Sequence, residues 1–322
     1  MSRISVKRKK WEEISVKNGI RSDLALEICN QITEHNPEVK GIECSNSHCG
    51  RMELSRVRIQ NKEGERLTGK PKGAYLTLTT GRLWLDDGEV FREKLLDFAS
   101  LLADFLKERF STAGTVLVAG LGNRSIIADA IGPAAVENLM VTRHLKRERP
   151  LIFQNLGLAD LCAVTPGVLG QTGIESADVI CGVISEIRPH GLLVIDALAS
   201  RDLSRLVTTV QICDSGISPG SGIGNSRPAL SPEALGIPVV TLGVPTVVDA
   251  ATLAADAIRE FSKEDTKAED IREQWSQNGL NFFVTPKETD QIIRVMGRFL
   301  GYGINLALNP DLSYEDMLSL VG

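Results

Sequence analysis

The sequence predicts an α/β fold of the phosphorylase/hydrolase-like kind, a three-layer sandwich with helices on both faces of a mostly parallel or mixed central sheet. Short apolar runs that read as buried strands recur at residues 115–119, 191–198 and 239–243. Runs with apolar residues at helical spacing lie between or after them, at 91–110 and 250–261. Such alternation is typical of parallel strands connected by helices. Ligands and substrates of these folds bind beyond the carboxyl ends of the strands.

Length permits one large α/β domain or two smaller ones, and the net charge favours a protein as the partner. The chain has 322 residues, of which 43% are hydrophobic, so it can bury a sizeable core. Its net charge is −5, which does not suit binding of nucleic acid through phosphates. The basic arm formed by Arg3 and residues 7–10 is interpreted as a solvated tail. Six cysteines scattered along the chain predict reduced thiols.

The N-terminal part predicts a tail, a helix and a small β-rich section. The first 20 residues are polar and weakly patterned, and Ser22 and Asp23 then precede a run over 24–33 that reads as a capped helix. Residues 39–85 alternate between apolar and polar positions and are broken by Gly and Lys clusters, which predicts strands that are partly antiparallel. The run at 91–110 has no internal Pro or Gly and predicts an amphipathic helix.

The rest of the chain predicts strand ends followed by helices. Gly120–Asn123 follows the strand at 115–119, and a helix should begin near Asp129 or Gly132. Residues 262–276 are charged and helical in composition, and 284–308 should form a closing helical section. The apolar region 235–258 is interrupted by prolines and aspartates and is too broken to span a bilayer. No apolar stretch typical of a secretory signal follows the basic arm, so we expect a cytoplasmic protein.

Several common chemistries find little support. The glycine pair Gly120 and Gly122 follows a strand, but the third glycine of a dinucleotide fingerprint is missing. There is no Gly-x-Ser-x-Gly elbow and no His-Glu-x-x-His pair. Cys44, His48 and Cys49 offer three metal ligands, but no second ligand pair at zinc-site spacing accompanies them. We interpret this segment as a plain loop and expect no metal or cofactor.

A second glycine cluster covers residues 214–225. It is too long and irregular for a phosphate-binding fingerprint, and its glycines permit sharp bends or close approach to another backbone. A long turn with capping polar residues explains it equally well. If the loop contacts a substrate, the candidate residues are Gly220, Gly222, Gly224 and Asn225.

Asp129 and Asp196 remain as candidate catalytic groups. Each lies just past or at the end of a predicted buried strand. Two carboxyl groups facing one water can hydrolyse a peptide bond if one is ionised and the other protonated. Their proximity enforces that difference, because like charges a few ångströms apart resist ionising together. An aspartate at a strand-to-helix junction is also a common helix N-cap, and spacing alone leaves both roles open.

The motifs around these aspartates resemble those of the spore germination proteases of endospore-forming bacteria. The resemblance extends from about residue 21 to beyond residue 249. The matching segments are Val118–Asn123 with Asp129–Pro133, Pro166–Gly173, Val194–Leu198, Pro219–Asn225 and Gly243–Ala250.

The resemblance implies an aspartic endopeptidase with a fold like that of hydrogenase maturation proteases, Asp129 and Asp196 as its active carboxyl groups, and no required metal. It implies small acid-soluble DNA-binding spore proteins as substrates, a homotetramer and a location in the forespore or spore core. It also implies a zymogen that removes its own N-terminal segment between an acidic and an apolar residue. We therefore predict a propeptide over residues 1–23, cleavage between Asp23 and Leu24, and a single catalytic domain over 24–322.

The sequence departs from the family pattern at two points. Ile127 and Ala128 stand where the family usually has Thr-Pro before the first aspartate, which removes a rigid residue from that approach. The tail before Asp23 is longer than is common, which leaves room for a second processing site.

Two other classes of function remain as alternatives. One is a metal-dependent maturation protease on the same fold, and the other is a non-catalytic binding protein built around the glycine loops. A metal enzyme should place His or Glu near the second carboxyl group, whereas residues 197–200 are Ala, Leu, Ala and Ser.

Overall fold

The computed structural model describes residues 22–35, 39–112, 114–220, 227–262, 275 and 282–321. The strands are β1 (Ile42–Cys49), β2 (Met52–Ile59), β3 (Gly73–Thr79), β4 (Val116–Gly120), β5 (Leu161–Val164), β6 (Gly191–Ser200), β7 (Thr209–Cys213), β8 (Val239–Asp249) and β9 (Phe283–Val284). The longer helices are α2 (Ala25–His35), α4 (Gly88–Lys107), α9 (Ser176–Ile187), α11 (Ala250–Ser262), α13 (Thr289–Leu308) and α14 (Tyr314–Val321). The short ones are α3 (Lys62–Thr68), α5 (Ile131–Val136), α6 (Arg143–Glu148), α7 (Pro150–Leu156), α8 (Leu169–Thr172) and α10 (Pro232–Leu235), with 3₁₀ turns η1 (Leu83–Leu85), η2 (Ile127–Asp129) and η3 (Leu203–Arg205).

The strands form one mixed sheet in the order β1-β2-β3-β7-β8-β6-β4-β5, and β9 pairs with β8. The four strands β5, β4, β6 and β8 are parallel neighbours. From β8 outward through β7, β3, β2 and β1 the pairing is antiparallel. The predicted fold class is confirmed. The β-rich N-terminal section is part of the same sheet, because β3 pairs with β7.

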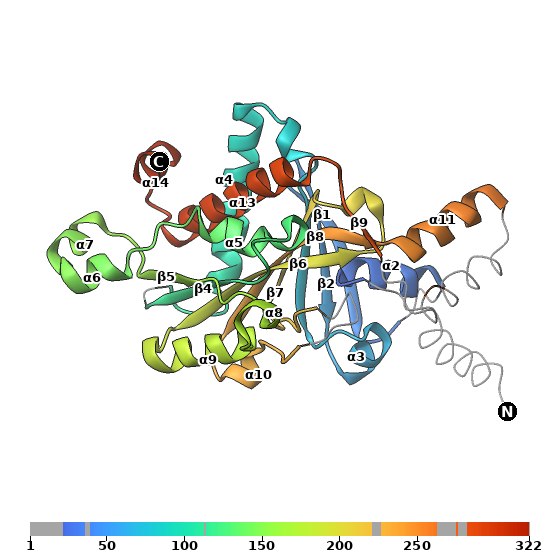
Figure 1. Ribbon diagram of the computed structural model, residues 1–322, viewed down its shortest axis with the longest axis horizontal. Coiled ribbons are helices and arrows are strands. Elements are labelled where there is room, and N and C mark those ends of the chain that lie inside the picture. Colours follow the sequence, from blue (N-terminus) through green and yellow to red (C-terminus); the bar gives the residue numbers. More distant parts are fainter. Residues whose placement is uncertain are drawn as a thin grey trace.

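Helices cover both faces of the sheet (Figure 1). Side chains of a strand alternate between faces, and β6 illustrates the division. Leu193 and Ile195 belong to the large core under α4, α5 and α13, while Leu192 and Val194 pack in a smaller core with Ile180 of α9. The sandwich is therefore built on strands that are buried on both sides, which is why they are apolar without alternation in the sequence.

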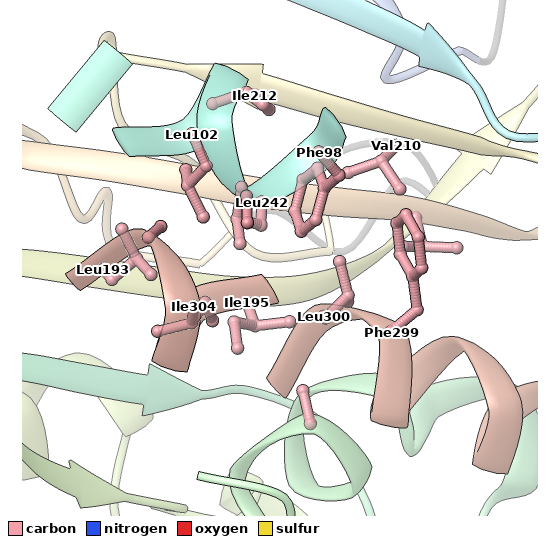
Figure 2. Close-up of a cluster of buried hydrophobic side chains, with 14 of the residues drawn as sticks. Phe98, Leu102, Leu193, Ile195, Val210, Ile212, Leu242, Phe299, Leu300 and Ile304 are labelled. Atoms are coloured by element: carbon pink, nitrogen blue, oxygen red, sulfur yellow. The ribbon is translucent and has the colours of Figure 1, made fainter. Parts of the chain in front are cut away.

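The larger core joins α4 and α13 to the centre of the sheet. Figure 2 shows side chains of these helices meeting strand residues of β6, β7 and β8. Phe98 of α4 and Phe299 of α13 stack with ring centroids 4.9 Å apart. The Asp87 side chain caps α4 by accepting a hydrogen bond from the Val90 N–H at 2.8 Å. The predicted helix at 91–110 and the closing helical section are confirmed, whereas most of residues 262–276 lie outside the described part.

The hairpin of β1 and β2 corrects two expectations. The strands predicted over residues 39–85 are confirmed as β1, β2 and β3, but the segment 43–50, interpreted as a plain loop, lies almost wholly in β1, which pairs along its whole length with β2. Cys29 of α2 and Cys44 of β1 form a disulfide, so reduced thiols were a wrong expectation for this pair. The disulfide forms because α2, which carries Cys29, packs on the face of the hairpin that carries Val57 and Ile59. Cys44 is the direct cross-strand partner of Val57, so it lies beside α2.

No helix among the described residues is long and apolar enough to cross a membrane. The region 235–258 instead begins at the last residue of α10 and contains the buried strand β8 and most of α11. Asp249 ends β8, and its Oδ1 accepts hydrogen bonds from the Ala251 and Thr252 N–H groups at 2.7 and 3.2 Å. This aspartate therefore caps α11.

Candidate active site

Asp129 is placed by the turn that follows β4. Gly122 has φ +115°, and a Cβ atom added there would lie 1.9 Å from the carbonyl oxygen of Asp129. Only glycine combines that backbone conformation with so close an approach. The Asn123 N–H donates to Oδ2 of Asp129 at 2.8 Å. The turn thus folds back on itself and holds the carboxyl group of Asp129 over the end of β4.

Asp196 lies within β6, just past the point where β4 ends. Gly120, the last residue of β4, pairs with Ile195, so Asp196 is the next residue along β6. Its side chain is 5% exposed, and its Oδ1 accepts a hydrogen bond from the Ala197 N–H at 2.9 Å. Parallel neighbours end at the same edge of a sheet, and η2, which contains Asp129, packs against β6 and β8. The fold therefore brings the two predicted carboxyl groups together.

Electrostatics differ between the two carboxyl groups. Burial raises the pKa of Asp196 well above its ordinary value, and the nearby charges of Asp129 and Asp23 raise it further. The hydrogen bond from the Ala197 N–H has the opposite effect and lowers this pKa. Burial also raises the pKa of Asp129, opposed by the hydrogen bond from Asn123. Asp196 is the more deeply buried group, so it retains a proton more readily. The pair can present one protonated and one ionised carboxyl group at the same time.

The predicted cleavage segment is docked on the same part of the sheet. The Asp23 N–H donates to the Ala199 carbonyl at 2.8 Å, and the Ala199 N–H donates to Oδ2 of Asp23 at 2.9 Å. Leu24 is fully buried. Asp23 and Leu24 therefore lie beside the strand that carries Asp196, and the Asp23 charge acts on that carboxyl group.

Residues that sequence reasoning missed complete this docking. Gln211 of β7 donates from Nε2 to the Asp23 carbonyl at 3.2 Å and accepts at Oε1 from the Ala25 N–H at 2.8 Å. Lys70, which follows α3, has its Nζ 3.7 Å from Oδ1 of Asp23. Gln211 was detectable as a polar residue inside an apolar strand. Lys70 carried no signal, because it lies in a turn cluster distant in the sequence.

The glycine loop is described only in part. Gly220 has φ +73°, and the Arg227 N–H donates to the Pro219 carbonyl at 3.0 Å. Gly222, Gly224 and Asn225 lie outside the described residues, so their predicted role stays a prediction.

The possible metal ligands of β1 diverge. Cys44 is in the disulfide with Cys29. His48 is exposed, whereas the Cys49 thiol contacts the Asp97 carbonyl on the other face of the strand at 3.4 Å. Within the described part of the chain, no three His, Cys, Asp or Glu side chains gather closely enough to hold a metal ion.

The turn before Asp129 carries two exposed apolar side chains. Ile126 and Ile127 are 55% and 50% exposed. The Asp129 N–H donates to the Ile126 carbonyl at 2.8 Å and closes the η2 turn without a proline. The main chain thus supplies here the turn that a proline would otherwise favour.

The chain is similar in sequence to germination proteases along most of its length. A family model described as germination protease matches residues 21–264. A germination protease from Caldanaerobacter subterraneus subsp. tengcongensis is 40% identical, with 94% of this chain and 98% of that protein covered. One from Bacillus subtilis is 38% identical, with 92% and 95% covered. A nickel–iron hydrogenase maturation protease structure from Thermococcus kodakarensis is 17% identical, covering 55% of this chain and 97% of that chain with a TM-score of 0.30. By its family model and its relatives, the chain belongs to the germination protease family.

Proposed function

We propose that the chain is an aspartic-type endopeptidase in which Asp129 and Asp196 activate one water molecule. The observation that carries the proposal is their meeting where β4 ends, Asp129 in the turn after β4 and Asp196 within β6, with the charge of Asp129 raising the pKa of Asp196. Family membership supports peptide-bond hydrolysis. In the alternatives, the same fold would use a metal ion or would only bind a partner.

The difference in burial assigns a role to each group. Asp196, which keeps its proton, donates a hydrogen bond to the scissile carbonyl oxygen. Ionised Asp129 takes a proton from water, the water oxygen bonds to the carbonyl carbon, and the proton of Asp196 passes to the carbonyl oxygen, which gives a tetrahedral diol. Asp129 then passes its proton to the leaving nitrogen as the carbon–nitrogen bond breaks, and a diol hydroxyl returns a proton to Asp196 as the carbonyl forms again. The two carboxyl groups thereby return to their starting protonation states.

The proposed substrates are small acid-soluble spore proteins, and the proposed precursor is a zymogen. Residues 1–23 would be a propeptide removed between Asp23 and Leu24, leaving 24–322 as one catalytic domain of a homotetramer in the spore core. The acidic-then-apolar pair Asp23 and Leu24, docked beside β6, supports this processing site. Light scattering of the processed protein tests the assembly, because four copies would give about four times the mass of one.

Self-processing is the direct test of the two carboxyl groups. The full-length chain is incubated at mildly acidic pH, and the new N-terminus is sequenced in the wild type, Asp129→Asn and Asp196→Asn. We expect Leu24 as the first residue in the wild type and none in either variant. Asp311→Asn, at an exposed aspartate, is the matched control and should process normally. If both site variants still process themselves, the catalytic pair is wrong.

A chelator separates the protease hypotheses. Unchanged processing in excess chelator supports the metal-free mechanism, and loss of processing that returns with added zinc favours a metal-dependent enzyme. If the wild type cleaves neither itself nor a spore protein but binds the spore protein, the binding-protein alternative is favoured.

A further inference from the structure

The N-terminal segment around Asp23 is held by groups from three separate places in the fold. β6 contributes the main chain of Ala199, β7 contributes Gln211, and the turn after α3 contributes Lys70. The Ala199 N–H donates to the Asp23 carboxylate, and the Lys70 ammonium lies beside it. Such an environment matches a carboxylate and disfavours a cationic side chain.

We propose that Lys70, the Ala199 N–H and Gln211 form the subsite that binds the acidic residue on the amino side of the cleaved bond. Asp23 occupies this subsite in the full-length chain. An Asp or Glu side chain of a protein substrate occupies it after the N-terminal segment has left. The inference rests on the proposed function, and it adds the residues that select the substrate.

Lys70 is built into the fold at this position. The helix α3 ends at Thr68 and is capped by Gly69, which has φ +65°, and the Lys70 N–H donates to Thr68 Oγ1 at 3.2 Å. The side chains of Lys70 and Asp23 are 20% and 12% exposed, so water screens their attraction only in part. A substrate without an acidic side chain would leave the Lys70 ammonium without this carboxylate partner.

Gln211 lies in the same cross-strand row as Asp196. Gly243 of β8 pairs with Asp196 on one side and with Gln211 on the other. Residues directly opposite each other point to the same face of a sheet. Asp196 and Gln211 are therefore about 10 Å apart across two strand spacings, with a residue that has no side chain between them. The Gln211 amide holds the peptide groups on both sides of Leu24 over this row.

The edge of β6 explains how an extended substrate enters. The Ile195 carbonyl accepts a hydrogen bond from the Leu121 N–H on the side of β4. In a strand, the N–H and C=O groups of every second residue point to the same side. The groups of Ala199 that bond to Asp23 therefore face the side on which β4 has already ended. An extended peptide can add to β6 there, so that main-chain bonds supply affinity and Lys70 supplies selectivity.

Charge reversal in the full-length chain tests the subsite in cis. Lys70→Glu and Asp23→Lys should each slow cleavage after residue 23 at least tenfold, and the double variant should recover at least half of the loss on a logarithmic scale. Lys72→Glu, at an exposed lysine two residues away, is the matched control and should process normally. Normal processing in Lys70→Glu, or a double variant no faster than either single one, overturns the inference and leaves the catalytic pair intact.

Paired peptides test the subsite in trans. Two peptides that differ only by Glu or Gln before a Leu are given to the processed wild type and to processed Lys70→Met. We expect kcat/KM of the wild type to favour Glu at least tenfold and that of the variant to differ less than threefold. An unchanged preference in Lys70→Met contradicts the proposal.

Hydrogen exchange tests docking independently of catalysis. In an Asp129→Asn background, Lys70→Met should accelerate exchange of the amides of residues 22–29 at least threefold, and Lys72→Met should not. If the wild type never cleaves itself but Lys70→Met still accelerates exchange, the proposed function fails and the carboxylate-binding subsite stands. Equal exchange in both lysine variants rejects the subsite even in an active protease.

Discussion

Asp196 is almost fully buried within β6, and the charge of a second carboxyl group, Asp129, acts on it. Burial and the Asp129 charge raise its pKa, and the hydrogen bond from the Ala197 N–H opposes them. A carboxyl group in this environment is more easily protonated in the folded protein than in the unfolded chain. Folding stability should therefore decrease as pH rises above the ordinary aspartate value of about 4.

Asp196→Asn should remove this pH dependence. Asparagine keeps an acceptor for the Ala197 N–H and carries no charge, so the variant should be more stable than the wild type at pH 8 and nearly equal at pH 4. Self-processing should fall by at least about 100-fold, because an amide cannot donate and regain the proton. Thermal unfolding from pH 4 to pH 8 measures the stability effect, with Asp311→Asn as the control. A variant less stable than the wild type at pH 8 would contradict this account.

The pKa of Asp160 is shifted in the opposite direction, below its ordinary value. Burial alone would raise its pKa, but hydrogen bonds from Lys146 and Thr115 and the charges of Lys146 and Arg143 lower it overall. The Lys146 Nζ and Thr115 Oγ1 donate to its Oδ2 at 2.8 and 2.7 Å. A lowered pKa stabilises the folded state above the ordinary value, and this stabilisation is lost as pH falls through the folded pKa.

Asp160→Asn should destabilise the protein by about 1–3 kcal/mol at neutral pH, since it removes the charge from charge-assisted hydrogen bonds. The difference from the wild type should shrink as pH falls below about 4, where the carboxyl group is protonated in the unfolded chain but still ionised in the folded protein. Urea unfolding at pH 7 and pH 3 measures both values. A difference that stays constant between these pH values would show that the charge of Asp160 is not responsible.

At the scale of elements, the turn between β4 and η2 determines where the site forms. β4 is buried at every residue, and its last residue pairs with β6. Gly122 then lets the chain reverse against the Asp129 carbonyl. The backbone conformation of Gly122 therefore determines where the carboxyl group of Asp129 lies relative to the end of β4.

Gly122→Ala should displace Asp129. A φ of +115° is strained for alanine, and the added Cβ would meet the Asp129 carbonyl oxygen at 1.9 Å. We expect a loss of about 1–3 kcal/mol in stability from the strain and a loss of self-processing. Gly157→Ala is the matched control, because Gly157 has φ +63° but nothing lies within 4 Å of its added Cβ. Normal processing in Gly122→Ala would show that this turn does not position Asp129.

At the scale of the whole molecule, α13 connects the site to the main core. It packs against α4 on one side and against α5, the helix after Asp129, on the other. A Cβ atom added at Gly297 would lie 2.8 Å from Cβ of Ala134, so the helices α13 and α5 are in close contact. Phe299 is fully buried, stacks on Phe98 and meets Phe91 edge-on at 5.9 Å.

Phe299→Ala should destabilise the protein by about 3–5 kcal/mol, because it opens a cavity between two helices and the sheet. Phe282→Ala, at a side chain that is 59% exposed, should change stability by less than about 0.5 kcal/mol. Chemical unfolding of both variants and the wild type gives the comparison. Similar losses in the two variants would contradict the assignment of Phe299 to the core.

Much of the fold was predictable from local pattern. The strands β4, β6 and β8 were expected from apolar runs, and α4 and α11 from helical spacing, because buried strands and amphipathic helices each impose a period on the sequence. The edge hairpin was harder. β1 is mostly exposed and polar, so residues 43–50 were interpreted as a loop within a region of predicted strands, and pairing with β2 makes them a strand.

The sequence by itself determined the fold class, the strands that end beside Asp129 and Asp196, and, through its motifs, the family to which the chain belongs. Only the tertiary structure decided which distant residues meet. It joined Cys29 to Cys44 and brought Lys70 and Gln211 to Asp23. The local sequence pattern reflects which side of one helix or strand is buried. The contacts named above depend on how separate elements pack against each other, and the sequence around a single polar residue does not indicate that packing.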